Sequence, residues 1–345
     1  MSRFARTAVR QLAAAGLLRH LVTRDFGGAS KVVETLSIAA AREGVAYGSG
    51  LADAMLALQG LGSMALTLVG SDEQKKQWLP KVARGRAIAG FAVTEPNAGS
   101  DVASMTSTAR RTKRGFELRG TKSFISNAGI ADFYTLFAKT DLAAGHKGIS
   151  CFIVPAGARG LKVKPLRLMA PHPIGELTLR GVKVPKEAVV GAEGDGFYLV
   201  MRVLDVMRPT VAAAACGFAW RALDEMKKRM KERKQFGRII GDNQGLRWRL
   251  AEAATDLEAA RLLTYRAASL KDSGQERVTL ESAQAKLFAT EAAQRIVDLA
   301  LQVHGGAGTL SGSVVERLYR EVRALRIYEG TSEILRDVVA RELLR

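Results

Sequence analysis

The spacing of apolar residues changes along the chain and divides it into three segments. Two-residue alternation or a short apolar run of strand length occurs five times in the middle segment, at Gly115–Gly120, Phe133–Ala138, Ile149–Val154, Leu161–Lys164 and Glu176–Arg180. Alternation of this kind is typical of half-buried strands. Five of the eight prolines fall between Pro155 and Pro185, and they exclude long helices there. We therefore predict a β domain over residues 88–192.

The flanking segments have the spacing of helices instead. Residues 1–87 are rich in alanine and leucine, hold one proline and are interrupted by glycines, which predicts an N-terminal domain of short helices. After Gly196, apolar residues recur at helical spacing over 197–234, 242–272, 277–304 and 331–345. Pro209 is placed near a helix start, where proline is tolerated. Four long helices with short loops predict an antiparallel bundle over residues 193–345.

Composition narrows the class of protein. Of 345 residues, 47% are apolar and 25% are charged, a globular composition that excludes disordered and collagen-like chains. The two cysteines, Cys151 and Cys216, lie 65 residues apart, which excludes a disulfide scaffold and a cysteine-based zinc cluster. No run of 18 uncharged apolar residues is present, so we predict no transmembrane segment and a reduced, intracellular protein.

Most common catalytic motifs are absent from the sequence. It contains no GxGxxG after a strand, no P-loop and no GxSxG, which argues against a Rossmann nucleotide site, a P-loop nucleotidase and an α/β-hydrolase. The four histidines show no metal-ligand spacing, so we predict no metal site; they are His20, His146, His172 and His304.

Polar, glycine-bearing segments remain as candidate sites. The small residues of Thr94–Asp101 leave backbone N–H groups open to a carbonyl-rich ring or a phosphate, although an ordinary turn explains them too. In Tyr328–Glu333, Thr331 is a good helix N-cap and Glu329 lies just before it. Burial between helices would raise the pKa of Glu329 toward that of a general base, whereas a solvated loop would not. His304–Gly308 is a glycine-rich bend typical of a helix C-terminus.

Six segments together resemble the acyl-CoA dehydrogenase family, in the family's order and spacing and over almost the whole chain. They are Thr94–Asp101 (TEPNAGSD), Gly120–Asp132 (GTKSFISNAGIAD), Glu232–Gly237 (ERKQFG), Gln302–Gly306 (QVHGG), Glu316–Arg320 (ERLYR) and Arg326–Glu333 (RIYEGTSE). The resemblance implies an α+β multidomain fold with an N-terminal helical domain, a middle β-barrel and a C-terminal antiparallel four-helix bundle. It also implies FAD as cofactor and a homotetramer, or at least a dimer.

The chemistry implied by the resemblance is α,β-dehydrogenation of an acyl-CoA thioester to the trans-2-enoyl-CoA, as in fatty acid metabolism. Glu329 matches the carboxylate that removes the α-proton while flavin N5 accepts the β-hydride. Some branches of the family carry the base on an earlier helix, at a position that matches Met207 here. Because methionine accepts no proton, Glu329 is the base that the pattern offers. The positions matching substrate contacts are Ser100, Arg208, Tyr328 and Gly330.

The resemblance also implies which residues hold FAD. Matches to contacts with the flavin ring and the pyrophosphate are Phe91, Thr94, Ser100, Phe124 and Ser126. Matches to residues that reach the FAD of a neighbouring subunit are Arg233, Phe236 and Gln244. The adenosine side of that cofactor is matched by Gln302, Gly305 and Gly306. The last FAD contacts are matched by Thr331 and Glu333.

Charge suggests further partners beside the acyl-CoA substrate and the electron-transfer flavoprotein that the resemblance implies as acceptor. The formal net charge is +18, and Lys227–Arg238 holds seven basic residues and one acid. A solvated helix face explains this, but a basic surface also attracts polyanions. CoA, an acidic acyl carrier protein and nucleic acid are the candidates. Nucleic acid comes last, because the DNA-binding branch of the family usually carries a basic C-terminal extension.

The N-terminus is rich in arginine and short for the family. Five arginines precede the first acid, Asp25, as in a mitochondrial transit peptide. A helix over Ala5–Leu18 with a basic face is the alternative, and we favour it because the resemblance extends back to about Val9. The family usually has one more helix before this region. We expect a cytoplasmic protein, with the mitochondrial matrix as the alternative.

Overall fold

The computed structural model describes residues 2–275 and 277–345, which form two compact units. The sheet unit contains the chain up to Glu34 and Ala54–Leu204. The bundle unit contains Thr35–Asp53 and Asp205–Arg345. The boundary falls inside two helices, α3 (Gly50–Val69) and α5 (Gly196–Glu232), which contribute to both units.

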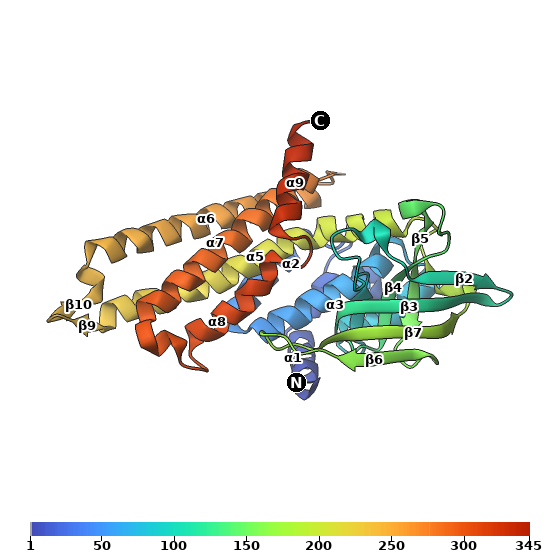
Figure 1. Ribbon diagram of the computed structural model, residues 1–345, viewed down its shortest axis with the longest axis horizontal. Coiled ribbons are helices and arrows are strands. Elements are labelled where there is room, and N and C mark those ends of the chain that lie inside the picture. Colours follow the sequence, from blue (N-terminus) through green and yellow to red (C-terminus); the bar gives the residue numbers. More distant parts are fainter. Residues whose placement is uncertain (1, 276) are drawn as a thin grey trace. The chain divides into compact units, whose positions relative to one another are not determined.

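One eight-stranded sheet organises the sheet unit (Figure 1). Its strands are β1 (Ala89–Ala92), β2 (Thr108–Thr112), β3 (Gly115–Ser126), β4 (Phe133–Lys139), β5 (Ile149–Pro155), β6 (Leu161–Pro165), β7 (Ile174–Val184) and β8 (Val189–Val190). They follow the order β6-β7-β3-β2-β4-β5-β8, and β1 pairs in parallel with β4. The five predicted strand segments lie in β3 to β7, so the predicted β domain is confirmed. The prediction missed β2, because its sequence TARRT is too polar to show alternation.

Alternate side chains of these strands form the core of the sheet unit. The buried rings of Phe116 and Phe152 meet edge to face, with their centroids 5.1 Å apart. Helices α1 (Ser2–Ala14) and α4 (Asp72–Ala83) belong to the same unit. The helix predicted over Ala5–Leu18 ends at Ala14, because Gly16 adopts a left-handed conformation with φ 75°.

Helix α3 is, among the described residues, the one helix long and apolar enough to cross a membrane by length and composition. Of its most apolar window, 61% is buried within the protein. The core helix of a globular protein passes the same test, so this feature is weak evidence for a membrane span.

The described residues of the bundle unit form six α-helices and a short hairpin. They are α2 (Thr35–Gly48), most of α5, α6 (Gln244–Asp272), α7 (Thr279–His304), α8 (Val314–Arg323), α9 (Ser332–Leu343) and the hairpin of β9 (Lys234–Gln235) with β10 (Arg238–Ile239). The four predicted windows correspond to α5, α6, α7 and α9, which confirms a C-terminal helical domain. The prediction missed α8, although its buried residues Val315, Leu318 and Val322 recur at helical spacing.

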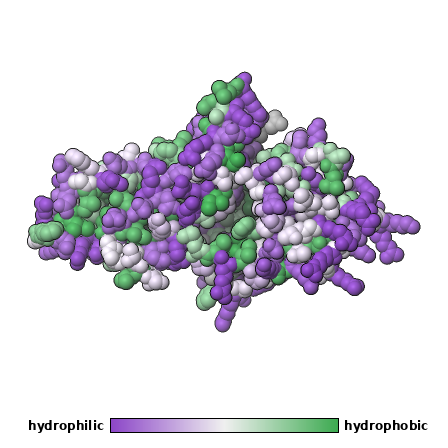
Figure 2. All heavy atoms as spheres, in the orientation of Figure 1, coloured by the Kyte–Doolittle hydropathy of each residue, from purple (hydrophilic) through white to green (hydrophobic). Residues whose placement is uncertain are grey.

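Small side chains let the bundle helices approach one another closely. The core of this unit is dominated by alanine, with Ala212, Ala214 and Ala215 of α5 fully buried. A Cβ atom at Gly217 of α5 would lie 2.2 Å from the Glu43 carbonyl oxygen of α2, so this crossing requires glycine. On the face shown in Figure 2 most side chains are hydrophilic, and apolar ones reach the surface at the end of α9, where Leu343 and Leu344 are exposed.

The prediction for Pro209 is wrong. It places this proline near a helix start, but α5 begins at Gly196 and continues unbroken past Pro209 to Glu232. A proline inside a helix removes one backbone hydrogen bond. The buried alanines that follow Pro209 pack the helix tightly, and this tertiary packing offsets the lost bond.

Candidate active site

The turn Tyr328–Gly330 lies in the bundle unit, just before α9, and its backbone is strained. Glu329 has φ 54° and Gly330 has φ 105°, so two consecutive residues are left-handed. A left-handed conformation costs a non-glycine residue about 1–2 kcal/mol. The Thr331 hydroxyl accepts a hydrogen bond from Ile334 N at 3.3 Å, which confirms Thr331 as the N-cap of α9. Strain of this size persists only where the surroundings fix the backbone.

Side chains from two long helices fix this turn. Arg208 of α5 donates from Nε to the Glu329 carbonyl oxygen at 3.1 Å. Lys286 of α7 donates from Nζ to the Gly330 carbonyl oxygen at 2.6 Å. The Ser332 hydroxyl donates to Oε1 of Glu291, also on α7, at 2.6 Å. The backbone around Glu329 is therefore fixed on both sides, and none of these hydrogen bonds involves the Glu329 side chain.

The Glu329 carboxyl is available for chemistry. Its Oε2 atom is buried and has no hydrogen-bond partner among the described residues. Burial raises the pKa of the Glu329 carboxyl, and the charges of Arg42, Lys286 and Arg208 oppose that rise. Within the described chain, the Glu329 N–H also has no backbone acceptor. An unpartnered acceptor oxygen with a raised pKa is what a general base near neutral pH requires.

A buried ion pair that the sequence did not predict belongs to the same unit. Arg42 of α2 binds Asp53 of α3 through two hydrogen bonds, Nε to Oδ1 at 2.8 Å and Nη2 to Oδ2 at 2.9 Å. Its Nη1 donates to the Thr210 hydroxyl at 3.0 Å, and its side chain is fully buried. Burial raises the pKa of the Tyr328 phenol, next to Glu329, and the charge of Arg42 opposes that rise. No local pattern marks this pair, because its members lie on separate helices.

Met207, the position that would carry the base in other branches, is fully buried on α5. Its carbonyl oxygen accepts a hydrogen bond from the Thr210 hydroxyl at 2.7 Å. Its thioether offers no group that could remove a proton, so of the two positions at which the family carries the base, Glu329 is the one that holds a carboxylate.

The loop Thr94–Asp101 lies in the sheet unit, after β1. The side chain of Glu95, a residue of this loop, holds it in place through hydrogen bonds. Glu95 Oε1 accepts hydrogen bonds from Lys122 Nζ at 2.8 Å and from Ser107 N at 2.9 Å. Its Oε2 accepts from Thr106 N at 2.7 Å and from the Thr106 hydroxyl at 2.8 Å. Lys122 Nζ also donates to the Val93 carbonyl oxygen at 3.0 Å. The pair joins the loop to β3, although sequence reasoning singled out neither residue.

The residues expected to contact the flavin have features that fit such a group. Phe124 is left-handed, with φ 55°, and 61% exposed, so an aromatic ring is held out of the core. The Ser126 hydroxyl lies 3.5 Å from His172 Nε2. Asn127 Oδ1 is buried without a partner in the described chain. An exposed ring, a hydroxyl and an orphaned acceptor, all in one strand end, suit a planar ligand that carries both donors and acceptors.

The remaining predicted FAD residues divide into two groups within the bundle unit. Thr331 and Glu333 lie at the start of α9, beside Glu329. The other group lies at the far end of the long helices (Figure 1): Arg233, Phe236, Gln244, Gln302, Gly305 and Gly306. Arg229 Nη2 donates to the His304 carbonyl oxygen at 3.3 Å, which joins the base of the hairpin to the glycine bend. At 1.5 Å per residue, the length of α7 from Lys286 to His304 separates the two groups by roughly 27 Å.

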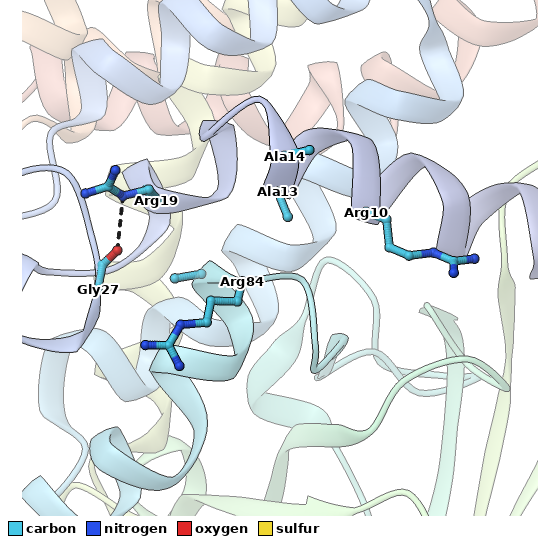
Figure 3. A pocket seen from close by; sticks show the side chains of 7 residues that line it. Arg10, Ala13, Ala14, Arg19, Gly27 and Arg84 are labelled. Atoms are coloured by element: carbon cyan, nitrogen blue, oxygen red, sulfur yellow. Dashed lines mark hydrogen bonds between the residues drawn. The ribbon is translucent and has the colours of Figure 1, made fainter.

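One surface hollow, with a volume of about 480 Å³, lies in the sheet unit, and its lining includes no predicted site residue. It is lined by Arg10, Ala13 and Ala14 of α1, by Ala83 at the end of α4 and Arg84 after it, and by Arg19 and Gly27 (Figure 3). Arg19 Nε donates to the Gly27 carbonyl oxygen at 3.3 Å, and Figure 3 shows the guanidinium groups of Arg10, Arg19 and Arg84 pointing in different directions. Because these groups do not converge, the hollow has no features of an anion site.

Comparisons with known proteins cover the whole chain. Three family models match: acyl-CoA dehydrogenase N-terminal domain over residues 1–86, middle domain over 90–182 and C-terminal domain over 194–344. The 3-(aryl)acrylate reductase of Clostridium sporogenes is 40% identical over 99% of this chain and 91% of its own length.

Solved structures agree with this assignment. The butyryl-CoA dehydrogenase of Megasphaera elsdenii superposes with a TM-score of 0.94 and 33% identity, over 98% of this chain and 89% of that one. The prolyl acyl carrier protein oxidase AnaB superposes with a TM-score of 0.93 and 32% identity, over 98% and 90% of the two chains. The chain therefore belongs to the acyl-CoA dehydrogenase family, and it is a FAD-dependent oxidoreductase that acts on CH–CH bonds.

Proposed function

We propose that the protein dehydrogenates an acyl-CoA thioester to the trans-2-enoyl-CoA, and that Glu329 removes the α-proton. The observation that carries this proposal is the buried, unpartnered Oε2 of Glu329 on a turn fixed by Arg208 and Lys286. Because burial raises the pKa of this carboxyl, its ionised form is a stronger base than a solvated glutamate.

The substrate carbonyl needs a hydrogen-bond donor, because removal of the α-proton places negative charge on that oxygen. The Glu329 N–H has no backbone acceptor within the described chain, and we assign it this role. Tyr328, Gly330 and Ser100 complete the proposed substrate contacts. Arg208 binds the Glu329 carbonyl oxygen through Nε, so its proposed contribution is partly to hold the turn.

FAD, when bound, supplies the acceptor for the β-hydride at flavin N5. In the sheet unit, the residues proposed to hold its ring and pyrophosphate are Phe91, Thr94, Ser100, Phe124 and Ser126. The exposed ring of Phe124 and the orphaned Asn127 Oδ1 support this assignment. Thr331 and Glu333 are the proposed contacts next to Glu329.

The separation of the FAD residues supports the proposal of a second subunit. The FAD residues at the far end of the long helices are separated from the Glu329 turn by the length of α7, which rises roughly 27 Å between Lys286 and His304. They are Arg233, Phe236, Gln244, Gln302, Gly305 and Gly306. Phe236 is 101% exposed at the hairpin tip, as expected of a side chain that binds another molecule. We propose that these residues hold the FAD of a neighbouring copy, in a dimer or a homotetramer.

The electron acceptor, the direction and the acyl group belong to the proposal as well. We propose an electron-transfer flavoprotein as acceptor and a cytoplasmic location. One similar protein is named a reductase, which supports testing the reverse reaction too. The similarity to a prolyl acyl carrier protein oxidase favours a carrier-bound acyl group as the second candidate substrate. An intact Glu329 favours both enzyme proposals over a DNA-binding flavoprotein.

An anaerobic spectrum of the purified protein tests the function directly. Titration with butyryl-CoA, longer straight-chain acyl-CoAs and 3-phenylpropanoyl-CoA should bleach the flavin band, and the rates rank the acyl groups. The same acyl groups on a carrier protein separate the two candidate substrates. A yellow protein that no thioester of either kind bleaches would contradict the proposal.

Replacement of the base tests the assigned residue. Glu329→Gln should keep its FAD but slow flavin reduction by ~10²–10⁴, the usual contribution of a general base. Asp337→Asn is the matched control, because it removes an exposed carboxylate that pairs with Arg341 on α9, the helix after the Glu329 turn. Normal bleaching in Glu329→Gln would exclude Glu329 as the base.

A further inference from the structure

Helix α7 holds the Glu329 turn at two points. Lys286 Nζ donates to the Gly330 carbonyl oxygen at 2.6 Å, and Glu291 Oε1 accepts from the Ser332 hydroxyl at 2.6 Å. These contacts lie on either side of the N-cap Thr331. Glu291 is also paired with Arg326, at 2.9 Å, whereas Lys286 has an uncharged carbonyl as its hydrogen-bond acceptor.

Lys286 is a buried cation without a direct ionic partner in the described residues. Its side chain is fully buried, and burial lowers the pKa of its ammonium group to about 8. Buried charges are normally paired, because desolvation strongly disfavours a lone ion. The acids that face Lys286 are Glu329, Glu291 and Glu333, and the base that faces it is Arg208.

Among these acids, Glu329 is the one whose negative charge best balances the positive charge of Lys286. Glu291 already binds Ser332 and Arg326, and the Glu333 side chain is 77% exposed. The other groups that face Glu329 are Arg42, Arg208 and Asp53. Asp53, which Arg42 binds through two hydrogen bonds, offsets part of the effect of Arg42, and Lys286 and Arg208 add further positive charge.

We propose that Lys286 is a positioning residue for proton removal: its ammonium group fixes the Gly330 carbonyl, and its charge favours the ionised carboxylate of Glu329. The inference rests on the proposed function, in which Glu329 is the base. It assigns two separable roles to one side chain, a hydrogen bond that holds the strained turn and a charge that prepares the base.

Two substitutions separate these roles. Lys286→Met removes the hydrogen bond and the charge, whereas Lys286→Gln removes the charge and keeps a donor. The measurement is the rate of anaerobic flavin reduction by butyryl-CoA or 3-phenylpropanoyl-CoA, whichever reacts faster, from about pH 5 to about pH 9. FAD absorbance and circular dichroism establish that each variant is folded, and Lys286→Gln carries the test if Lys286→Met is not.

The expected result is a displaced pH profile. Without the positive charge, the pKa of Glu329 rises further, so the acid limb of the profile should move to higher pH in both variants. Lys286→Met should also slow reduction near neutral pH by up to about a hundredfold, because the turn loses a support and the base is misplaced. Above about pH 8 the wild-type ammonium loses its proton, and the rates of wild type and Lys286→Gln should converge.

Controls distinguish this inference from the proposed function. Arg336→Gln removes an exposed guanidinium near Glu291 and Glu333, and its profile should match the wild type. An equal loss of rate at every pH, with the acid limb of the pH profile unmoved, would mean that Lys286 contributes packing alone. That result would overturn the inference. If Glu329→Gln is inactive while the limb of Lys286→Gln is unmoved, this inference alone fails. If Glu329→Gln is active, the proposed function fails first.

Discussion

Glu95 in the sheet unit and Glu329 in the bundle unit both carry carboxyl oxygens that are held away from water, but the groups around them differ. Both oxygens of Glu95 accept hydrogen bonds, from Lys122, Ser107 and Thr106. Burial acts to raise the pKa of Glu95, but the charge and hydrogen bond of Lys122 and the other donors lower it to about 2. Burial raises the pKa of Glu329, whose Oε2 has no partner among the described residues.

The two turns are also held in opposite ways. Glu95 fixes its surroundings with its own side chain, which accepts hydrogen bonds from the backbone N–H groups of residues 106 and 107 and from the ammonium of Lys122. Glu329 is fixed through its backbone, which leaves its side chain free. A buried carboxylate whose oxygens all accept hydrogen bonds stabilises the structure around it. A buried carboxylate whose backbone is held but whose oxygen lacks a hydrogen-bond donor can act as a base.

The largest test of this comparison is Glu95→Gln. The variant leaves the buried ammonium of Lys122 without its counter-charge, which typically destabilises a protein by about 3–5 kcal/mol. Urea unfolding should show a loss of that size. FAD retention should fall as well, since the loop Thr94–Asp101 loses its brace.

The double variant Glu95→Gln/Lys122→Met is the control for this prediction. Replacing both members of a buried pair is often close to neutral, so it should recover much of the lost stability. A neutral single variant would break the comparison, because Glu95 would then be no more structural than Glu329.

Local sequence patterns predicted the parts of the site that lie close together in the chain. Thr331 as N-cap and Glu329 just before it follow from one segment of six residues, and helical or alternating periods predicted most long elements. The pattern placed Pro209 wrongly, because packing of α5 and not local propensity decides whether the helix continues.

The residues that tune the site were not predictable in this way. Lys286 lies 44 residues before Gly330, and Lys122 lies 27 residues after Glu95. Each lysine has an unremarkable local pattern, typical of a solvated charge, until the fold brings its acceptor within reach. The Arg42–Asp53 pair joins two helices in the same manner. Such contacts are decided by tertiary structure, which periodicity does not encode.

Unfolding experiments at several pH values test the difference between Glu329 and Glu95 through a smaller effect, the pH dependence of the free energy of unfolding. Because the folded protein raises the pKa of Glu329, the unfolded chain releases this proton at lower pH than the folded chain. Stability contributed by the neutral carboxyl is therefore present at low pH and lost as pH rises above the ordinary value of about 4.5.

Glu329→Gln should consequently gain stability relative to the wild type as pH rises from about 4.5, while the two proteins should match below it. Glu95 has the opposite sign: its stabilisation is complete above about pH 4.5 and lost as pH falls toward about 2. Thermal unfolding of wild type, Glu329→Gln and Glu95→Gln across this range measures both slopes. Parallel slopes for the two variants would contradict the distinction between a carboxylate that stabilises the structure and one that acts as a base.

The smallest effect compares two helix caps, one in each unit. Thr331 caps α9 beside the base, and Ser71 caps α4 in the sheet unit with Gln74 as its reciprocal partner. Replacing either cap residue by alanine should lower the free energy of unfolding by about 1 kcal/mol. Thr331→Ala should in addition slow flavin reduction, because it loosens the backbone that presents Glu329, whereas Ser71→Ala should leave that rate unchanged. Equal effects of the two substitutions on flavin reduction would mean that the rigidity of the Glu329 turn makes no special contribution to proton removal.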